Sequence, residues 1–192
     1  WMTAGRGIVH SEMPQQESGV MRGFQLWLNL PAAEKMKAAG YRDIQPEEIP
    51  VARQQGVSVR VIAGELEIGG GSVTGAVTGG STEPLYADVH LESGARVSLP
   101  VPQALNALVY LYEGGASLVS EDRNQALALS SANILEQGDE VLIEAGEAGA
   151  QLLLIAGRPI GEPVVQYGPF VMNKPAEIEQ ALADYRDGTL TV

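Results

Sequence analysis

The stretch that decides the fold is Leu85–Tyr112, LYADVHLESGARVSLPVPQALNALVYLY. Apolar and polar residues alternate in its first part, LYADVHLES, as they do in a half-buried β-strand. Gly94 then turns the chain into a second run, ARVSLPVP, and a third, largely apolar run covers 104–112. Short runs of this kind separated by glycine turns indicate antiparallel strands, so we expect a β-sandwich or a small barrel.

Further strands are predicted on both sides of this stretch. Val57–Gly64, VSVRVIAG, alternates in the same way, and Val20–Leu30, VMRGFQLWLNL, places its leucines on one face of a half-buried strand. Short strands separated by polar turns continue through 116–143, and Gln151–Ala156 is expected to be a buried strand. The predicted fold class is therefore all-β.

Two segments depart from the strand pattern. Gly69–Gly80, GGGSVTGAVTGG, is rich in glycine, but no Lys-Ser or Lys-Thr follows it as a phosphate-binding loop requires, so we expect a flexible loop. Near the end of the sequence, apolar residues recur at i, i+3, i+4 and i+7 from Ile178. Pro175 suits the first turn of a helix and Gly188 its end, which predicts a short amphipathic helix between them.

The composition excludes several classes of protein. The 192 residues carry 12 basic and 24 acidic side chains, a net charge of −12, so the surface repels the phosphate backbone of nucleic acids. Cysteine is absent, which excludes disulfides, thiolate catalysis and cysteine-held metal centres. The sequence shows neither an apolar run of about 20 residues nor a secretory signal. We therefore expect a cytoplasmic protein that binds neither nucleic acid nor membranes.

Candidate metal ligands occur in Trp1–Pro14, WMTAGRGIVHSEMP. This stretch reads as a strand, on which His10 and Glu12 share one face because successive side chains alternate. An imidazole and a carboxylate side by side supply half of a metal site. The alternative is a hydrogen-bonded pair or two exposed side chains. The other histidine, His90, lies on a strand with the parity of Asp88, and we expect a surface or hydrogen-bonded residue there rather than a ligand.

Four stretches together resemble the pirin family of the cupin superfamily: WMTAGRGIVHSEMP (1–14), FQLWLNLPAAEKM (24–36), EEIP (47–50) and EPVVQYGPFVMN (162–173). The resemblance covers nearly the whole chain and implies a bicupin, two antiparallel β-barrels with a metal in the N-terminal barrel only. It divides the chain into residues 1–50, a remnant of the N-terminal barrel with a linker, and residues 51–192, the C-terminal barrel with its helix.

The resemblance also implies a ligand set of three histidines and one glutamate around iron, Fe²⁺. The match assigns the later two ligands to His10 and Glu12, whereas the earlier two histidines would precede Trp1. The chain therefore resembles a pirin that lacks the front of its first barrel. We expect iron to be absent or weakly bound in this chain, because two protein donors rarely hold such a metal against water.

Two functions from different classes follow from the resemblance. One is a quercetin 2,3-dioxygenase acting on a flavonol, in which Glu12 is both a metal ligand and a carrier of the substrate's proton. The other is a non-catalytic regulator that binds protein partners, either in transcriptional co-regulation or on metabolic enzymes. An incomplete first barrel also leaves unpaired strand edges, so we expect self-association between copies.

Overall fold

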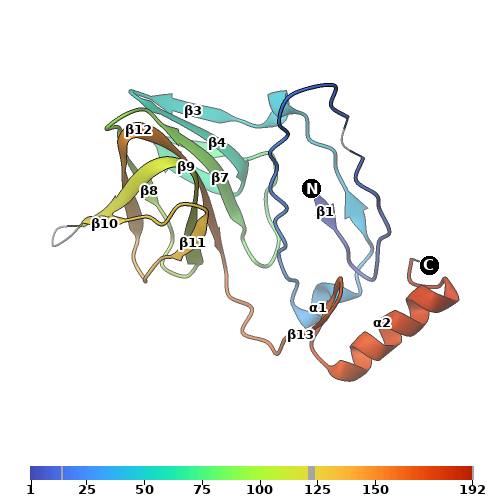
Figure 1. The fold of residues 1–192 in the computed structure, drawn as a ribbon. Helices are drawn as coiled ribbons and strands as arrows, with labels where there is room; N and C mark the ends of the chain where they lie inside the picture. The colour runs from blue at the N-terminus through green and yellow to red at the C-terminus, as the bar shows by residue number, and fades with distance from the viewer. Residues whose placement is uncertain (14, 121–123, 192) are drawn as a thin grey trace. The chain divides into compact units, whose positions relative to one another are not determined.

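The structure is a computed structural model that describes residues 1–13, 15–120 and 124–191. Its residues cluster into two compact units. One unit joins Trp1–Arg42 to Ile160–Val192, and the other comprises Asp43–Pro159. In Figure 1 the first unit is coloured blue and red, because it contains both ends of the chain, and the second unit has the intermediate colours.

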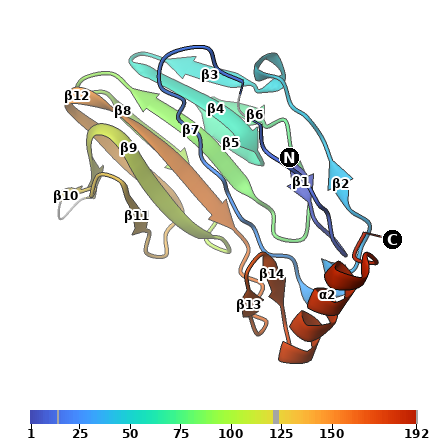
Figure 2. The ribbon, with the colours of Figure 1, turned by 45° about the vertical axis from the view of Figure 1, so that its right-hand side comes forward.

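The unit of the middle residues is built from β-strands that form a curved sheet (Figure 2). A short 3-10 helix, η1 (Pro46–Glu48), precedes it. Its strands are β3 (Val51–Gln54), β4 (Val57–Ala63), β5 (Glu65–Ile68), β6 (Gly71–Thr74), β7 (Leu85–Leu91), β8 (Arg96–Pro100), β9 (Asn106–Val119), β10 (Asn124–Ala126), β11 (Ser131–Ile134) and β12 (Glu140–Gly157). The main sheet has the order β10-β9-β12-β7-β4-β3, with β11 paired to β9 and β8 to β12, while β5 and β6 form a separate hairpin. The predicted all-β class is confirmed.

The alternation in the sequence divides each central strand between a core face and an outer face. β4 buries its odd-numbered residues from Val57 to Ala63, and β7 buries those from Leu85 to Leu91. The core is aliphatic, and its largest fully buried side chains are Leu66, Leu99, Leu111, Ile143, Leu152, Leu154, Val59, Val61, Val89, Val97 and Val109. Each such side chain contributes about 1.5–3 kcal/mol of burial free energy, so the core holds the outer face in a fixed register.

β12 is the strand that joins the parts of this unit. Its first residues, 140–144, pair with β8, and its later residues, 150–156, pair with β7. β9 lies along its other edge from residue 143 to residue 157. Register shifts interrupt the pairing with β9 between Ala145 and Ala150 and again between Gln151 and Leu152. Such bulges increase the local twist, which lets one long strand pass from one neighbour to the next.

The unit of the chain ends has little sheet. β1 (Met2–Thr3) pairs with β2 (Gly40–Tyr41), β13 (Val165–Tyr167) pairs with β14 (Phe170–Met172), and α1 (Ala32–Lys35) is a single helical turn. The predicted C-terminal helix is confirmed as α2 (Pro175–Asp187). Pro175 occupies its first turn, and Gly188 ends it in the left-handed conformation at φ 75°.

Three predictions of local structure are wrong. The predicted strand in Trp1–Pro14 is reduced to β1 (Met2–Thr3), so 8–13 forms no strand, and neither does 20–30; Pro14 lies outside the described residues. A strand needs a neighbour for its backbone N–H and C=O groups, and no described residues pair with either segment. The glycine-rich stretch 69–80 is a loop only in part, because its residues 71–74 form β6 against β5.

Two general features complete the fold. No helix within the described ranges is long and apolar enough to cross a membrane. The compact units divide the chain at Arg42 and Ile160. The predicted division into residues 1–50 and 51–192 separates the two cupin barrels rather than these compact units, and it stays a prediction.

Candidate functional site

The predicted metal ligands lie in a segment without regular secondary structure. His10 and Glu12 are both exposed. Glu12 Oε1 accepts a hydrogen bond from Gln25 Nε2 at 3.0 Å, which links the two extended segments of this unit. The strand predicted to align the imidazole with the carboxylate does not form, and the hydrogen bond from Gln25 restrains the Glu12 carboxylate.

These residues do not complete a metal site on their own. Within residues 1–13, 15–120 and 124–191, no three His, Cys, Asp or Glu side chains gather closely enough to hold a metal ion. The neutral imidazole and the carboxylate are ligand types that suit iron, but a non-haem iron centre takes at least three protein donors. The described part of the chain therefore supplies at most half of the ligand set that the resemblance implies.

A second group of polar residues lies on the outer face of the β-rich unit. Asp88 and His90 are two residues apart on β7, so both side chains leave the sheet on the side opposite the core. Tyr112 joins them from β9. Gln151 pairs with Glu113 and Leu152 pairs with Leu111, so Tyr112 is the additional residue of a β-bulge. The bulge lets the consecutive residues Tyr112 and Glu113 place their side chains on the same face of the sheet.

These three side chains form one hydrogen-bonded cluster. The Tyr112 hydroxyl donates to Asp88 Oδ1 at 2.7 Å. His90 Nε2 lies 3.0 Å and 3.1 Å from the two Asp88 oxygens and 3.1 Å from the Tyr112 oxygen. Arg60 on β4 approaches the same carboxylate, with its guanidinium 3.5 Å from Asp88 Oδ2. The carboxylate therefore has donors from three strands, β4, β7 and β9.

The cluster fixes the protonation of its members. A carboxylate accepts hydrogen bonds, so the contact between His90 and Asp88 places a proton on His90 Nε2. Burial, reinforced by the hydrogen bond to Asp88 and by the charge of Asp88, holds the pKa of Tyr112 far above its usual value. Burial and the same charge also raise the pKa of Tyr86. At neutral pH the face thus presents an oriented imidazole beside neutral phenols.

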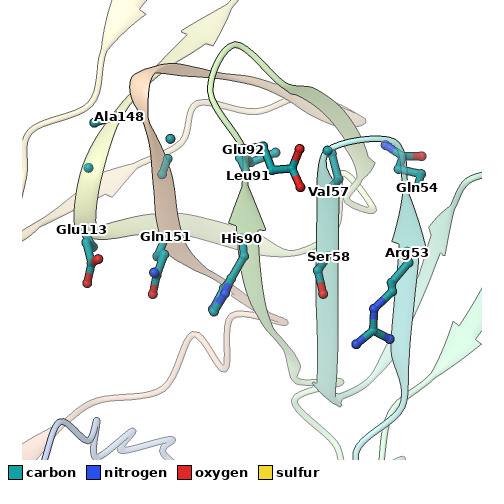
Figure 3. A pocket seen from close by; sticks show the side chains of 14 residues that line it. Arg53, Gln54, Val57, Ser58, His90, Leu91, Glu92, Glu113, Ala148 and Gln151 are labelled. Atoms are coloured by element: carbon teal, nitrogen blue, oxygen red, sulfur yellow. The ribbon is translucent and has the colours of Figure 1, made fainter.

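A pocket of about 350 Å³ lies beside this cluster, and His90 forms part of its wall. Figure 3 shows the polar side chains that project from neighbouring strands to the same side of the sheet: Glu113, Gln151, His90, Ser58 and Arg53. Leu91 and Val57 line its other side near the strand ends. A concave volume of this size with converging polar groups has the character of a small-molecule site.

The sequence predicted part of this arrangement. His90 is hydrogen-bonded, as its position on a strand predicted, and it shares parity with Asp88. The spacing Asp88-x-His90 was the available signal for the pair, because i and i+2 residues share a face. The contribution of Tyr112 could not be read from the sequence, since it depends on the bulge in β9 and on the pairing across β12.

Comparison with protein families finds two matches. The model described as Pirin matches residues 1–28, and the model of the pirin C-terminal cupin domain matches residues 86–191. The first match contains both His10 and Glu12, and the second contains Asp88, His90 and Tyr112.

Relatives with curated names match along nearly the whole chain. A Pseudomonas aeruginosa protein, named provisionally as a quercetin 2,3-dioxygenase, is 50% identical over 100% of this chain and 67% of its own length. A Caulobacter vibrioides pirin-like protein is 48% identical over 98% of this chain and 66% of its own length. Human pirin is 41% identical over 97% of this chain and 63% of its own length. The chain thus spans about two thirds of the length of these relatives.

A solved structure agrees with these matches. The crystal structure of a quercetin 2,3-dioxygenase from Acinetobacter baumannii superposes with a TM-score of 0.74 and 34% identity, over 85% of this chain and 55% of that one. This likeness supports the predicted cupin architecture of the strands. The family models, the relatives and the fold agree, and the chain belongs to the pirin family of cupin proteins.

Proposed function

We propose that this chain is the larger part of a metal-dependent pirin with quercetin 2,3-dioxygenase activity, in which His10 and Glu12 are ligands of an iron ion. One observation carries the proposal: the pirin family model matches residues 1–28, where this imidazole and this carboxylate lie. The names of the Pseudomonas aeruginosa and Acinetobacter baumannii proteins favour a flavonol as the substrate class.

Additional donors are part of this proposal. Two more imidazoles are needed for a set of three histidines and one glutamate, and His90 is already held by Asp88 and Tyr112. Iron is then absent or weakly bound in this chain alone, and no turnover is expected from it.

Residues of this chain have defined tasks in the proposal. His10 and Glu12 each supply one ligand atom, and Gln25 restrains the Glu12 carboxylate through its 3.0 Å hydrogen bond. When the metal and substrate are bound, the same carboxylate takes the proton of the substrate hydroxyl. Residues 51–192 form the second cupin barrel with its helix, a structural part without metal. A cytoplasmic location accords with the absence of cysteine.

The first experiment measures intact mass and iron content on one purified sample, followed by quercetin consumption under air. We expect the 192-residue chain to hold little iron and to leave quercetin unchanged. A longer chain that includes the additional donors is expected to hold about one iron per molecule and to consume quercetin. If that longer, iron-loaded protein leaves quercetin unchanged, the dioxygenase proposal fails.

Matched variants of the longer chain assign the ligands. His10→Ala and Glu12→Gln are each expected to lower iron occupancy by about tenfold or more, since removal of a direct ligand costs at least what loss of an outer partner costs. Glu17→Gln is the control, because Glu17 is an exposed glutamate five positions further along the same segment. Equal iron content in Glu12→Gln and Glu17→Gln would exclude Glu12 as a ligand.

A second candidate function is binding to a protein partner. The segment that follows the metal-ligand pair exposes large apolar side chains, including Val20 at 93% and Trp27 at 58% of their maximal area. Apolar side chains gathered at a surface are typical of protein association. The regulator alternative predicts that a metal-loaded protein without quercetin turnover still binds a partner through this segment.

A further inference from the structure

The pocket of the β-rich unit is lined by a row of polar residues that the strand register aligns. Gln151 on β12 is the partner of both His90 on β7 and Glu113 on β9. On the other side of His90, Ser58 on β4 is its partner, and Arg53 on β3 is the partner of Ser58. Neighbouring strands are about 4.8 Å apart, so the row offers a polar group at each such step across the sheet.

Backbone geometry gives this pocket a fixed shape. Gly149 and Gly114 line it, both with left-handed φ values, +74° and +77°. A side chain at Gly149 would place its Cβ 2.7 Å from the carbonyl oxygen of Leu91, so only glycine lets β12 approach β7 here. Close backbone packing and the bulge in β9 therefore form the pocket before any ligand arrives.

Hydrogen bonds with Asp88 and Tyr112 orient His90, the central residue of this row. The Asp88 carboxylate accepts a hydrogen bond from His90 Nε2, and this contact fixes the orientation of the imidazole. No hydrogen bond to His90 Nδ1 is seen from the residues that the structure describes. Asp88 and Tyr112 thus position the polar ring of His90 in the pocket wall.

The charges of the wall select the kind of ligand. Glu92 and Glu113 are the carboxylates and Arg53 is the guanidinium among the lining residues, so acidic groups outnumber basic ones. With a chain net charge of −12, a phosphorylated or carboxylated ligand is repelled. Gln151, Gln54 and Ser58 both donate and accept hydrogen bonds. A ligand with hydroxyl groups, which both donate and accept hydrogen bonds, can pair with the donors and the acceptors of this wall.

We infer that this pocket binds a neutral, polyhydroxylated small molecule of the size of a monosaccharide or a cyclic polyol. Hydroxyl groups of the ligand form hydrogen bonds with His90, donate to Glu113, and both donate to and accept from Gln151. The pocket volume of about 350 Å³ is at the lower end of the range for small-molecule sites, in keeping with a single ring. The site lies in the β-rich unit and does not depend on the proposed iron chemistry.

The test uses saturation-transfer NMR on the 192-residue protein with D-glucose and myo-inositol as probes. We expect transfer of saturation to the ring protons of at least one probe. In ¹⁵N-labelled protein the same probe should shift the Gln151 side-chain amide signals and the backbone amides of Gly114 and Gly149. Inorganic phosphate at the same concentration should produce none of these shifts.

Variants connect the signal to the pocket. Gln151→Leu is expected to weaken probe binding by about tenfold, the effect of losing roughly 1.4 kcal/mol of hydrogen bonding. Gln125→Leu is the matched control, an exposed glutamine on β10 outside the pocket, and it should bind the probe like the parent. His90→Leu provides a second variant, with unchanged amide spectra elsewhere in the barrel showing that each protein is folded.

Several results would overturn the inference. One is the absence of saturation transfer to both probes in folded protein at tens of millimolar. Another is transfer that persists unchanged in both Gln151→Leu and His90→Leu, which would locate binding elsewhere. Phosphate shifts at these same amides, in place of sugar shifts, would show that the charge argument selects the wrong ligand.

Discussion

Lys35 shows how a single residue can organise the unit formed by the chain ends. Its side chain is only 7% exposed, and its ammonium donates to Asn29 Oδ1 at 2.6 Å and to the Val171 carbonyl at 2.9 Å. Burial lowers the pKa of Lys35, while the charges of Glu162 and Glu177 oppose that shift. A buried ammonium of this kind persists because its partners replace the water it lost.

We expect Lys35→Met to destabilise this unit by about 1–3 kcal/mol, since it leaves two acceptors without their donor. Both tryptophans, Trp1 and Trp27, belong to the same unit, so urea unfolding followed by tryptophan fluorescence measures it directly. Lys37→Met is the control, because Lys37 forms an exposed ion pair with Glu34 worth at most about 1 kcal/mol. Equal unfolding midpoints for the two variants would contradict this role of Lys35.

Tyr112 links the polar cluster to the pH dependence of stability. Its pKa is raised in the folded protein, so the phenolate is less favourable there than in the unfolded chain. The stabilisation is complete below the unfolded pKa of about 10 and is lost as the pH rises above it, by at most about 1.4 kcal/mol per pH unit.

We expect Tyr112→Phe to make the loss of stability between pH 10 and pH 12 shallower, although it also removes the hydrogen bond to Asp88. Urea unfolding followed by circular dichroism at several pH values gives the slope. Tyr185→Phe, at an exposed tyrosine of α2, should keep the parental slope. If Tyr112→Phe keeps it too, the phenol is not shielded as the structure indicates.

At the scale of the elements, the junction of β7, β9 and β12 depends on glycine. Gly149→Ala combines a left-handed backbone with a Cβ 2.7 Å from the Leu91 carbonyl oxygen, so we expect a loss of about 3 kcal/mol or more. Gly94→Ala shares the left-handed φ but meets open space, and it should cost about 1 kcal/mol. Urea unfolding compares them, and equal midpoints would show that β12 does not need this close approach.

The elements also show what a sequence can and cannot predict. β4, β7 and α2 follow from alternation, helical spacing and terminal residues, because each signal is contained in its own segment. The stretch 20–30 alternates like a strand and 8–13 was predicted as the end of one, yet neither forms a strand, since a strand also needs a partner that no local pattern supplies. For the same reason the sequence could not predict that Tyr112 joins the cluster, because its position depends on the pairing register of β9 with β12.

For the whole molecule, the exposed apolar side chains predict association between copies. We expect sedimentation velocity to show a mass that rises with concentration, because burying Trp27 and its neighbours removes apolar area from water. Trp27→Ser should weaken that association by about tenfold. Ile134→Ser, at an exposed residue of β11, should leave it unchanged. A single monomeric species at every concentration would contradict the prediction.

The position of β12 in the sequence determines when the β-rich unit can fold during translation. β7, β8 and β9 all use this strand as a partner, yet it is the last of them to leave the ribosome. A nascent chain that ends before residue 140 therefore carries three hydrophobic strands with open edges. Chaperone capture should concentrate in that interval, and ribosomes stalled before and after residue 157 should yield nascent chains of sharply different protease resistance.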